Sequence, residues 1–296
     1  MTTIEAFDRL MARVTSGERL DADDLAQLAS TPDILQLGML ADTVRRKLHG
    51  PQVTYLRVAL CAFDTSMSEH VTPLAREIRL TGKPDSLDVA VTAVETARAL
   101  AGDRAVSGFS WADVERIGGA DVPKALGRLR SAGLDAIADL PLDRIADPAA
   151  AVDALSSAGF QRLRLTIDKA PADARTALLV RAAELQDQFA CIQAVSPLPM
   201  TLDSLRPTTG YTDVKSIAIA RLAAPNIPTV QVDWLRYGPK LAQVALTFGA
   251  DDVDNVTPSD EAPLGHRRAP LEEVRRNIEA AGLEPSERDG HFSLVG

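Results

Sequence analysis

Residues 230–256, VQVDWLRYGPKLAQVALTFGADDVDNV, predict a complete strand–helix–strand unit. Residues 230–235 are predicted to form a strand, and Pro239 favours the start of a helix because its missing N–H is unpaired there in any case. Gly249 stops that helix, and 252–256 forms a second strand. Two parallel strands joined by one helix are the repeating unit of an α/β protein.

The same alternation covers most of the chain. Strands are predicted at 53–60, 75–80, 105–109, 136–140, 162–167, 190–195, 230–235 and 252–256, and helices at 86–100, 123–132, 148–158, 172–186, 213–223 and 239–248. Eight strands, most of them followed by a helix, favour a closed (β/α)8 TIM-type barrel. An open doubly wound sheet is the alternative, but no Gly-x-Gly-x-x-Gly turn follows the first strand. The connection at 62–72 is too short and polar to predict a barrel helix.

Two further segments flank the predicted barrel. Residues 1–50 form an N-terminal helical extension, with Thr31-Pro32 as the predicted start of its last helix. The barrel then takes residues 51–296, including a C-terminal helix at 271–281 and a tail at 284–295 that could add a closing strand.

Composition narrows the class of protein. The 296 residues carry 32 basic and 41 acidic side chains, a net charge of −9, so nucleic acid and anionic membrane are poor partners. Nothing in the sequence resembles a signal peptide or a transmembrane run. The two cysteines, Cys61 and Cys191, are widely separated, which favours reduced thiols in a cytoplasmic protein.

Barrel chemistry belongs at the carboxyl ends of the strands. Polar residues at those ends predict a pocket for a small polar ligand, with these candidates: Thr81, Gly82, Asp168, Asp233, Arg236 and Asp254. Arg236 and Asp254 follow neighbouring strands and can reach one ligand, while Asp233 needs a partner if it is buried. The alternative is that these acids and Arg236 pair with each other and plug the barrel mouth.

Other chemistry finds weaker support. The four histidines lie outside the strand ends, and Lys83 and Lys169 are interpreted as solvated loop lysines. Asp251, Asp252 and Asp254 are interpreted as a solvated strand entrance whose first two members cap the turn after Gly249, so no metal site is predicted.

Three stretches carry a family resemblance. Residues 238–254, 216–228 and 37–50 resemble the radical-SAM enzymes of the futalosine route to menaquinone, a group that includes aminofutalosine synthase and dehypoxanthine futalosine cyclase. The resemblance spans most of the chain but is looser between Cys61 and about Asp187. It implies a barrel with a substrate pocket at its mouth.

One departure from that family concerns its cofactors. These enzymes hold a [4Fe–4S] cluster through a Cys-x-x-x-Cys-x-x-Cys loop after the first strand, and here Cys61-Ala62-Phe63 resembles only the end of that motif. Thr81-Gly82 stands where the family shows paired glycines facing S-adenosylmethionine. Since one thiolate cannot hold a cluster that needs three, both the cluster and S-adenosylmethionine are predicted to be lost, and no cofactor is expected.

Two functions fit this combination. The favoured one is a non-catalytic protein of menaquinone biosynthesis that acts as a binding partner, carrier or scaffold, in a possible hetero-complex with an active enzyme of the pathway. The alternative is a repurposed non-radical enzyme that acts on a small polar intermediate. Fold resemblance does not choose between them.

Overall fold

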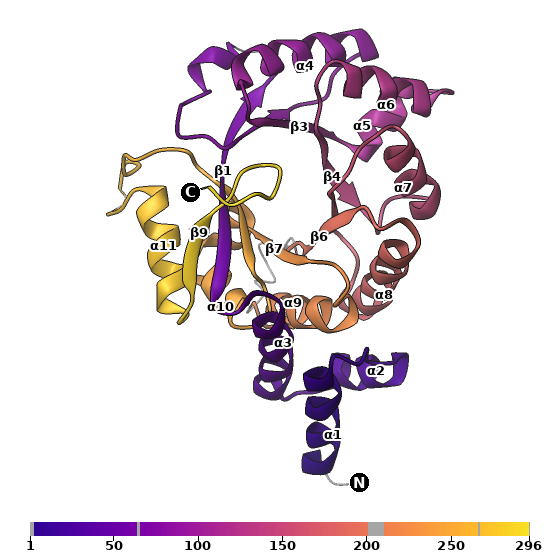
Figure 1. Cartoon of the computed structure of the whole chain (residues 1–296), viewed down its shortest axis with the longest axis vertical. Coiled ribbons are helices and arrows are strands. Elements are labelled where there is room, and N and C mark those ends of the chain that lie inside the picture. Colours follow the sequence, from indigo (N-terminus) through magenta and orange to yellow (C-terminus); the bar gives the residue numbers. More distant parts are fainter. Residues whose placement is uncertain (1–2, 64–65, 201–209, 266, 296) are drawn as a thin grey trace, which may run out of the picture.

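The computed structural model describes residues 3–63, 66–200, 210–265 and 267–295. Eight parallel strands close into a barrel (Figure 1), because each strand pairs with the next along the chain and β8 pairs with β1. The strands are β1 Gln52–Ala62, β2 Glu77–Thr81, β3 Ala105–Ser110, β4 Ala136–Pro141, β5 Leu163–Ile167, β6 Ile192–Pro197, β7 Thr229–Asp233 and β8 Asp252–Val256. This confirms the predicted barrel, and only β8 has the predicted bounds at both ends.

Helices form an outer layer around the strands (Figure 1). They are α4 Leu87–Ala101, α5 Trp111–Gly118, α6 Val122–Ser131, α7 Pro148–Ser157, α8 Ala172–Phe189, α9 Tyr211–Ala223, α10 Trp234–Leu246 and α11 Pro270–Ala280. The sequence did not predict α5, which a capping box between Ser110 and Asp113 starts directly after β3. Between β1 and β2 the described residues hold a single 3₁₀ turn, η1 Met67–Glu69, as the short polar connection predicted.

The predicted seventh strand was too long. β7 ends at Asp233 rather than Leu235, because the Asp233 carboxylate accepts a hydrogen bond from the Arg236 backbone N–H and caps α10. One helical turn follows before Gly238 breaks the helix with a φ of 69°, and Pro239 stands next to that break inside α10. The predicted start of the helix at Pro239 is therefore wrong by about one helical turn, because α10 begins at Trp234 and Gly238-Pro239 marks a break within it.

The extension before the barrel consists of α1 Thr3–Ser16, α2 Ala22–Ser30 and α3 Ile34–His49 (Figure 1). The predicted cap on α3 was wrong by two residues: the cap is Asp33, whose carboxylate accepts from the Gln36 N–H, while the Thr31 hydroxyl accepts from the N–H of Asp33. α3 packs against α9, and α2 packs against α8 and α9. The predicted boundary at residue 50 falls between α3 and β1.

A ninth strand explains the length of β1. The lower half of β1 pairs with β9, Glu284–Glu287, and its upper half pairs with β2 through Val58–Ala62. The tail therefore adds a strand, as predicted. This strand pairs with the first residues of β1, Gln52–Tyr55, which precede the part of β1 that pairs with β2. Within the described ranges, no helix is both long and apolar enough to cross a bilayer.

Candidate functional site

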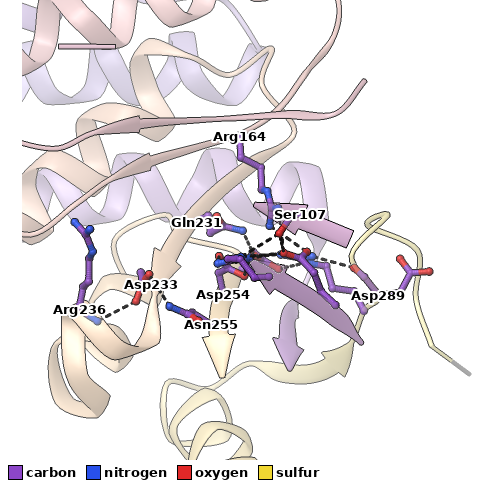
Figure 2. A network of polar contacts seen from close by, with 12 residues as sticks. Ser107, Arg164, Gln231, Asp233, Arg236, Asp254, Asn255 and Asp289 are labelled. Atoms are coloured by element: carbon purple, nitrogen blue, oxygen red, sulfur yellow. Dashed lines mark hydrogen bonds and ion pairs between the residues drawn. The ribbon is translucent and has the colours of Figure 1, made fainter. Parts of the chain in front are cut away.

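A network of ion pairs fills the barrel interior (Figure 2). Arg79 donates to both carboxylate oxygens of Asp254 at 2.9 and 3.0 Å and to Glu77 at 2.8 Å. Arg164 donates to both oxygens of Glu77 at 3.2 Å, and the Ser107 hydroxyl donates to the same carboxylate at 2.5 Å. Glu77, Arg79, Arg164 and Asp254 are all buried, so two arginines and two carboxylates balance inside the protein.

The charge balance shows in the pKa directions. Burial alone would raise the pKa of Glu77, but the charges of Arg164 and Arg79 outweigh it and lower that pKa below its ordinary value. The pKa of Asp254 is likewise lowered, because Arg79 and then Arg164 overcome the cost of burial. Both carboxylates are therefore ionised in the folded protein.

A second pair lies next to the first. Arg288, from the tail after β9, donates to both oxygens of Asp252 at 2.5 and 2.7 Å, and Gln231 donates to Asp252 at 2.7 Å. Asp251 pairs with the buried Arg221 instead. The interpretation of Asp251, Asp252 and Asp254 as a solvated strand entrance was wrong: all three are buried, and each is paired with a different arginine.

Above this network, a pocket of about 420 Å³ opens at the carboxyl ends of the strands. Thr81, Gly82, Asp233, Arg236 and Asp254 all line it, so the structure brings together five of the six predicted residues. The sixth, Asp168, lies at the rim, where its carboxylate accepts from Arg236 at 3.3 Å and from Arg144 at 3.1 Å.

Asp233 and Asn255 form an acceptor-rich wall of this pocket (Figure 2). Asp233 accepts from the backbone of Arg236 at 2.9 Å and from the Asn255 amide at 3.2 Å, but within the described part of the chain it forms no ion pair with an arginine side chain. Burial, and then the charge of Asp254, raise the pKa of Asp233 above its ordinary value of 3.8. The Asn255 Oδ1 is buried and has no hydrogen-bond partner among the residues that the structure describes. A ligand that carries hydroxyl or amino donors would satisfy both groups.

The alternative, in which the acids pair with Arg236 and plug the mouth, holds for Asp168 alone among the contacts that Arg236 makes with the described acids. The Arg236 side chain is 49% exposed and contacts Asp168 at the rim, while Arg79 takes Asp254 below it. The pocket is therefore open above the ion pairs. The first turn of α10, beside the pocket, is held in place by the Tyr237 hydroxyl, which donates to the Pro197 carbonyl at 2.5 Å.

Gly82 shapes the wall next to β1. Its φ is +103°, and a Cβ added there would lie 2.7 Å from the Phe63 ring. Only glycine adopts this turn without strain, and its missing side chain lets Phe63 pack on the backbone.

Sequence reasoning missed three charged members of this site: Glu77, Arg79 and Arg164. A signal for the first two was present. Glu77 and Arg79 stand two residues apart in a strand, as do Asp252 and Asp254. In a barrel covered by helices, charged residues at alternate strand positions point to the interior.

Comparisons with known proteins bear on the origin of this barrel. Residues 200–295 match the sequence profile of the CofH/MqnC C-terminal region. Aminodeoxyfutalosine synthase of Thermus thermophilus is 25% identical in an alignment that covers 96% of this chain and 94% of that protein. The 5-amino-6-(D-ribitylamino)uracil–L-tyrosine 4-hydroxyphenyl transferase of Archaeoglobus fulgidus is 32% identical, but the match covers 40% of this chain and 38% of that protein.

Solved structures agree on the fold. The crystal structure of methylornithine synthase superposes with a TM-score of 0.69 and 18% identity, covering 96% of this chain and 98% of that one. This chain is a homologue of the radical-SAM enzymes of the futalosine pathway.

The two cysteines of this chain do not fit a [4Fe–4S] cluster of the kind that the resemblance implies. Leu60 lines the mouth pocket, and Cys61 is not among the residues that line it. Because successive strand side chains point to opposite faces, the buried Cys61 thiol faces the helical layer and not the pocket. Cys191 lies at the opposite end of the barrel, before β6. Burial raises the pKa of both thiols, which disfavours the thiolate that binds iron.

Proposed function

We propose that this radical-SAM homologue is a cluster-free, cytoplasmic protein of menaquinone biosynthesis that binds a small polar ligand at the barrel mouth. The carrying observation is the first strand: Leu60 lines the pocket, while the lone Cys61 faces the helical layer. A site-differentiated cluster requires three thiolates, and the sequence has two cysteines at opposite ends of the barrel.

The ligand class follows from the pocket walls. The acceptor oxygens of Asp233, Asn255 and Asp139 have no cationic side-chain partner in the described ranges, and Arg236 offers a half-exposed guanidinium. We infer a ligand with several hydroxyl or amino groups and one anionic group that can replace Asp168 on Arg236. The ion pairs beneath form a fixed floor.

The favoured role is that of a carrier or binding partner of an active pathway enzyme. Leu35 and Met39, one helical turn apart on α3, are 73% and 56% exposed and suit contact with a partner protein. The identity of that partner stays a prediction.

A specific observation supports turnover as a second candidate. A buried carboxyl with a raised pKa beside a pocket is a common arrangement for a general acid or base. Asp233 has that character, and its Oδ atoms are held by Asn255 and the start of α10. In this alternative Asp233 would move a proton in an elimination, isomerisation or hydrolysis of a pathway intermediate.

Gene replacement in the source organism tests the proposal. Deletion of the gene should lower the menaquinone content, and a Cys61→Ala variant should restore it fully, since Cys is replaced by a residue of similar size that cannot bind iron. Arg236→Ala should fold but fail to restore it. A normal menaquinone content after deletion would refute the pathway role, and failure of a folded Cys61→Ala protein would refute the cluster-free role. Restoration by Asp233→Asn would favour binding over turnover, because an amide caps α10 but moves no proton.

A further inference from the structure

A second pocket of about 590 Å³ lies at the opposite end of the barrel. It is formed where β4, β5 and β6 begin, and Gly290, His291 and Phe292 of the tail cover part of it. This end of a barrel usually contributes stability alone. The family comparisons assign no function to it.

The lining of this lower pocket is basic in an acidic protein. Among the described residues, Arg130, Arg162 and Arg164 line it with one acidic residue, Asp135. With histidine neutral, this is a local charge of +2 in a chain of net charge −9. The Asp135 carboxylate is already engaged by Arg130 at 3.0 Å, by Arg98 at 3.2 Å and by the Val106 N–H at 2.9 Å. Asp135 therefore has little capacity to neutralise a further cation.

Arg162 carries the surplus charge. It stands at the entrance, immediately before β5, is exposed, and makes no ion pair or side-chain hydrogen bond with the residues that the structure describes. Arg164, two residues further along, is buried and committed to Glu77. The positive charge that is available to a ligand therefore lies at the entrance of the lower pocket and not deep inside it.

Amide groups complete the lining. Gln161 and Gln193 both line the pocket, beside His291. Guanidinium and amide groups together recognise planar or tetrahedral oxyanions through charge-assisted hydrogen bonds. The volume exceeds that of a free inorganic anion and is within the range of small-molecule sites.

We propose that this lower pocket binds a small organic anion, with its carboxylate or phosphate group on Arg162 and Arg130 and its body against Gln161 and His291. The site is distinct from the mouth pocket, because the Glu77–Arg164 ion pair lies between them: Arg164 lines both. It does not depend on the proposed function of the mouth.

Calorimetric titration of the intact chain with phenyl phosphate and with benzoate tests this proposal. The two probes share a ring and differ in the anionic group, so binding of one, the other or both assigns the site to phosphates, to carboxylates or to both. Arg162→Gln should weaken binding about tenfold or more, as expected for a lost charge-assisted bond. Arg164 is unsuitable for this test, because its removal leaves Glu77 buried without that partner.

Two arginine variants serve as matched controls. Arg236→Gln removes a guanidinium from the mouth pocket, and Arg181→Gln removes one from the outside of α8, where it pairs with Glu184. Arg181→Gln should bind the probes like the unmodified chain, and Arg236→Gln should leave intact the binding that Arg162→Gln weakens. The proposal is overturned if neither probe binds, if Arg162→Gln binds as well as the unmodified chain, or if Arg236→Gln is the variant that loses binding.

Discussion

Two arginine–aspartate pairs in the same barrel have different environments. Arg79 and Asp254 are joined by two hydrogen bonds at 2.9 and 3.0 Å inside the barrel, and both are buried. Arg236 meets Asp168 at 3.3 Å on the rim, with the arginine side chain 49% exposed. The first pair is an interior contact between strands of the barrel, and for the second we propose that Arg236 exchanges Asp168 for a ligand. Burial, and not the residue types, separates the two roles.

Removal of the buried arginine should have the largest effect. Arg79→Leu leaves Asp254 without its bidentate partner and Glu77 with Arg164 alone, so the free energy of unfolding should fall by about 3–5 kcal/mol. Urea denaturation followed by circular dichroism measures the loss. A loss below about 1 kcal/mol would show that the interior pair is no more structural than the rim pair.

The rim pair should give a small effect on stability. Arg236→Ala removes one exposed ion pair and should change the free energy of unfolding by less than about 1 kcal/mol. The same denaturation assay, with Asp168→Asn as the matched variant from the other side of the pair, checks this. A loss as large as that of Arg79→Leu would mean that Arg236 plugs the mouth, and the proposed ligand role would then fail.

The pH dependence should separate the acids of the two regions. The lowered pKa values of Glu77 and Asp254 mean that their stabilising contribution is present above their ordinary values of 4.5 and 3.8 and is lost as the pH falls below them. The ionised Asp233 carboxylate has the opposite effect on stability, because its raised pKa means that the folded state favours its protonated form. Asp233→Asn should therefore raise the melting temperature slightly at pH 7, and the gain should shrink as the pH falls towards 3.8. An unchanged difference between the two proteins across that pH range would contradict the raised pKa.

The barrel and most of its mouth could be predicted from the sequence. The spacing of apolar residues that distinguishes helices from strands can be read within a short window of sequence. Pro239 and Gly249 likewise indicate the helix of the unit at 230–256. Five of the six predicted residues share one pocket because the carboxyl ends of parallel strands meet at one end of a barrel.

The pairing of charges could not be predicted. Arg79 and Asp254 are 175 residues apart, and nothing local to either shows that they meet. The sequence left open which of the three acids Arg236 would meet, and it contacts Asp168 because α10 begins at Trp234 and directs its first turn to the rim. The start of α10 depends on the Asp233 cap, and for this reason β7 ends two residues before the predicted position.

Anaerobic reconstitution with iron and sulfide tests the cluster-free proposal most directly. The intact chain and its Cys61→Ala variant are treated in parallel, and iron, sulfide and visible charge-transfer absorbance are measured after desalting. We predict that neither protein retains stoichiometric iron or sulfide and that their spectra are the same. A reducible cluster of about four irons per chain, present in the intact protein and absent from Cys61→Ala, would contradict the proposal.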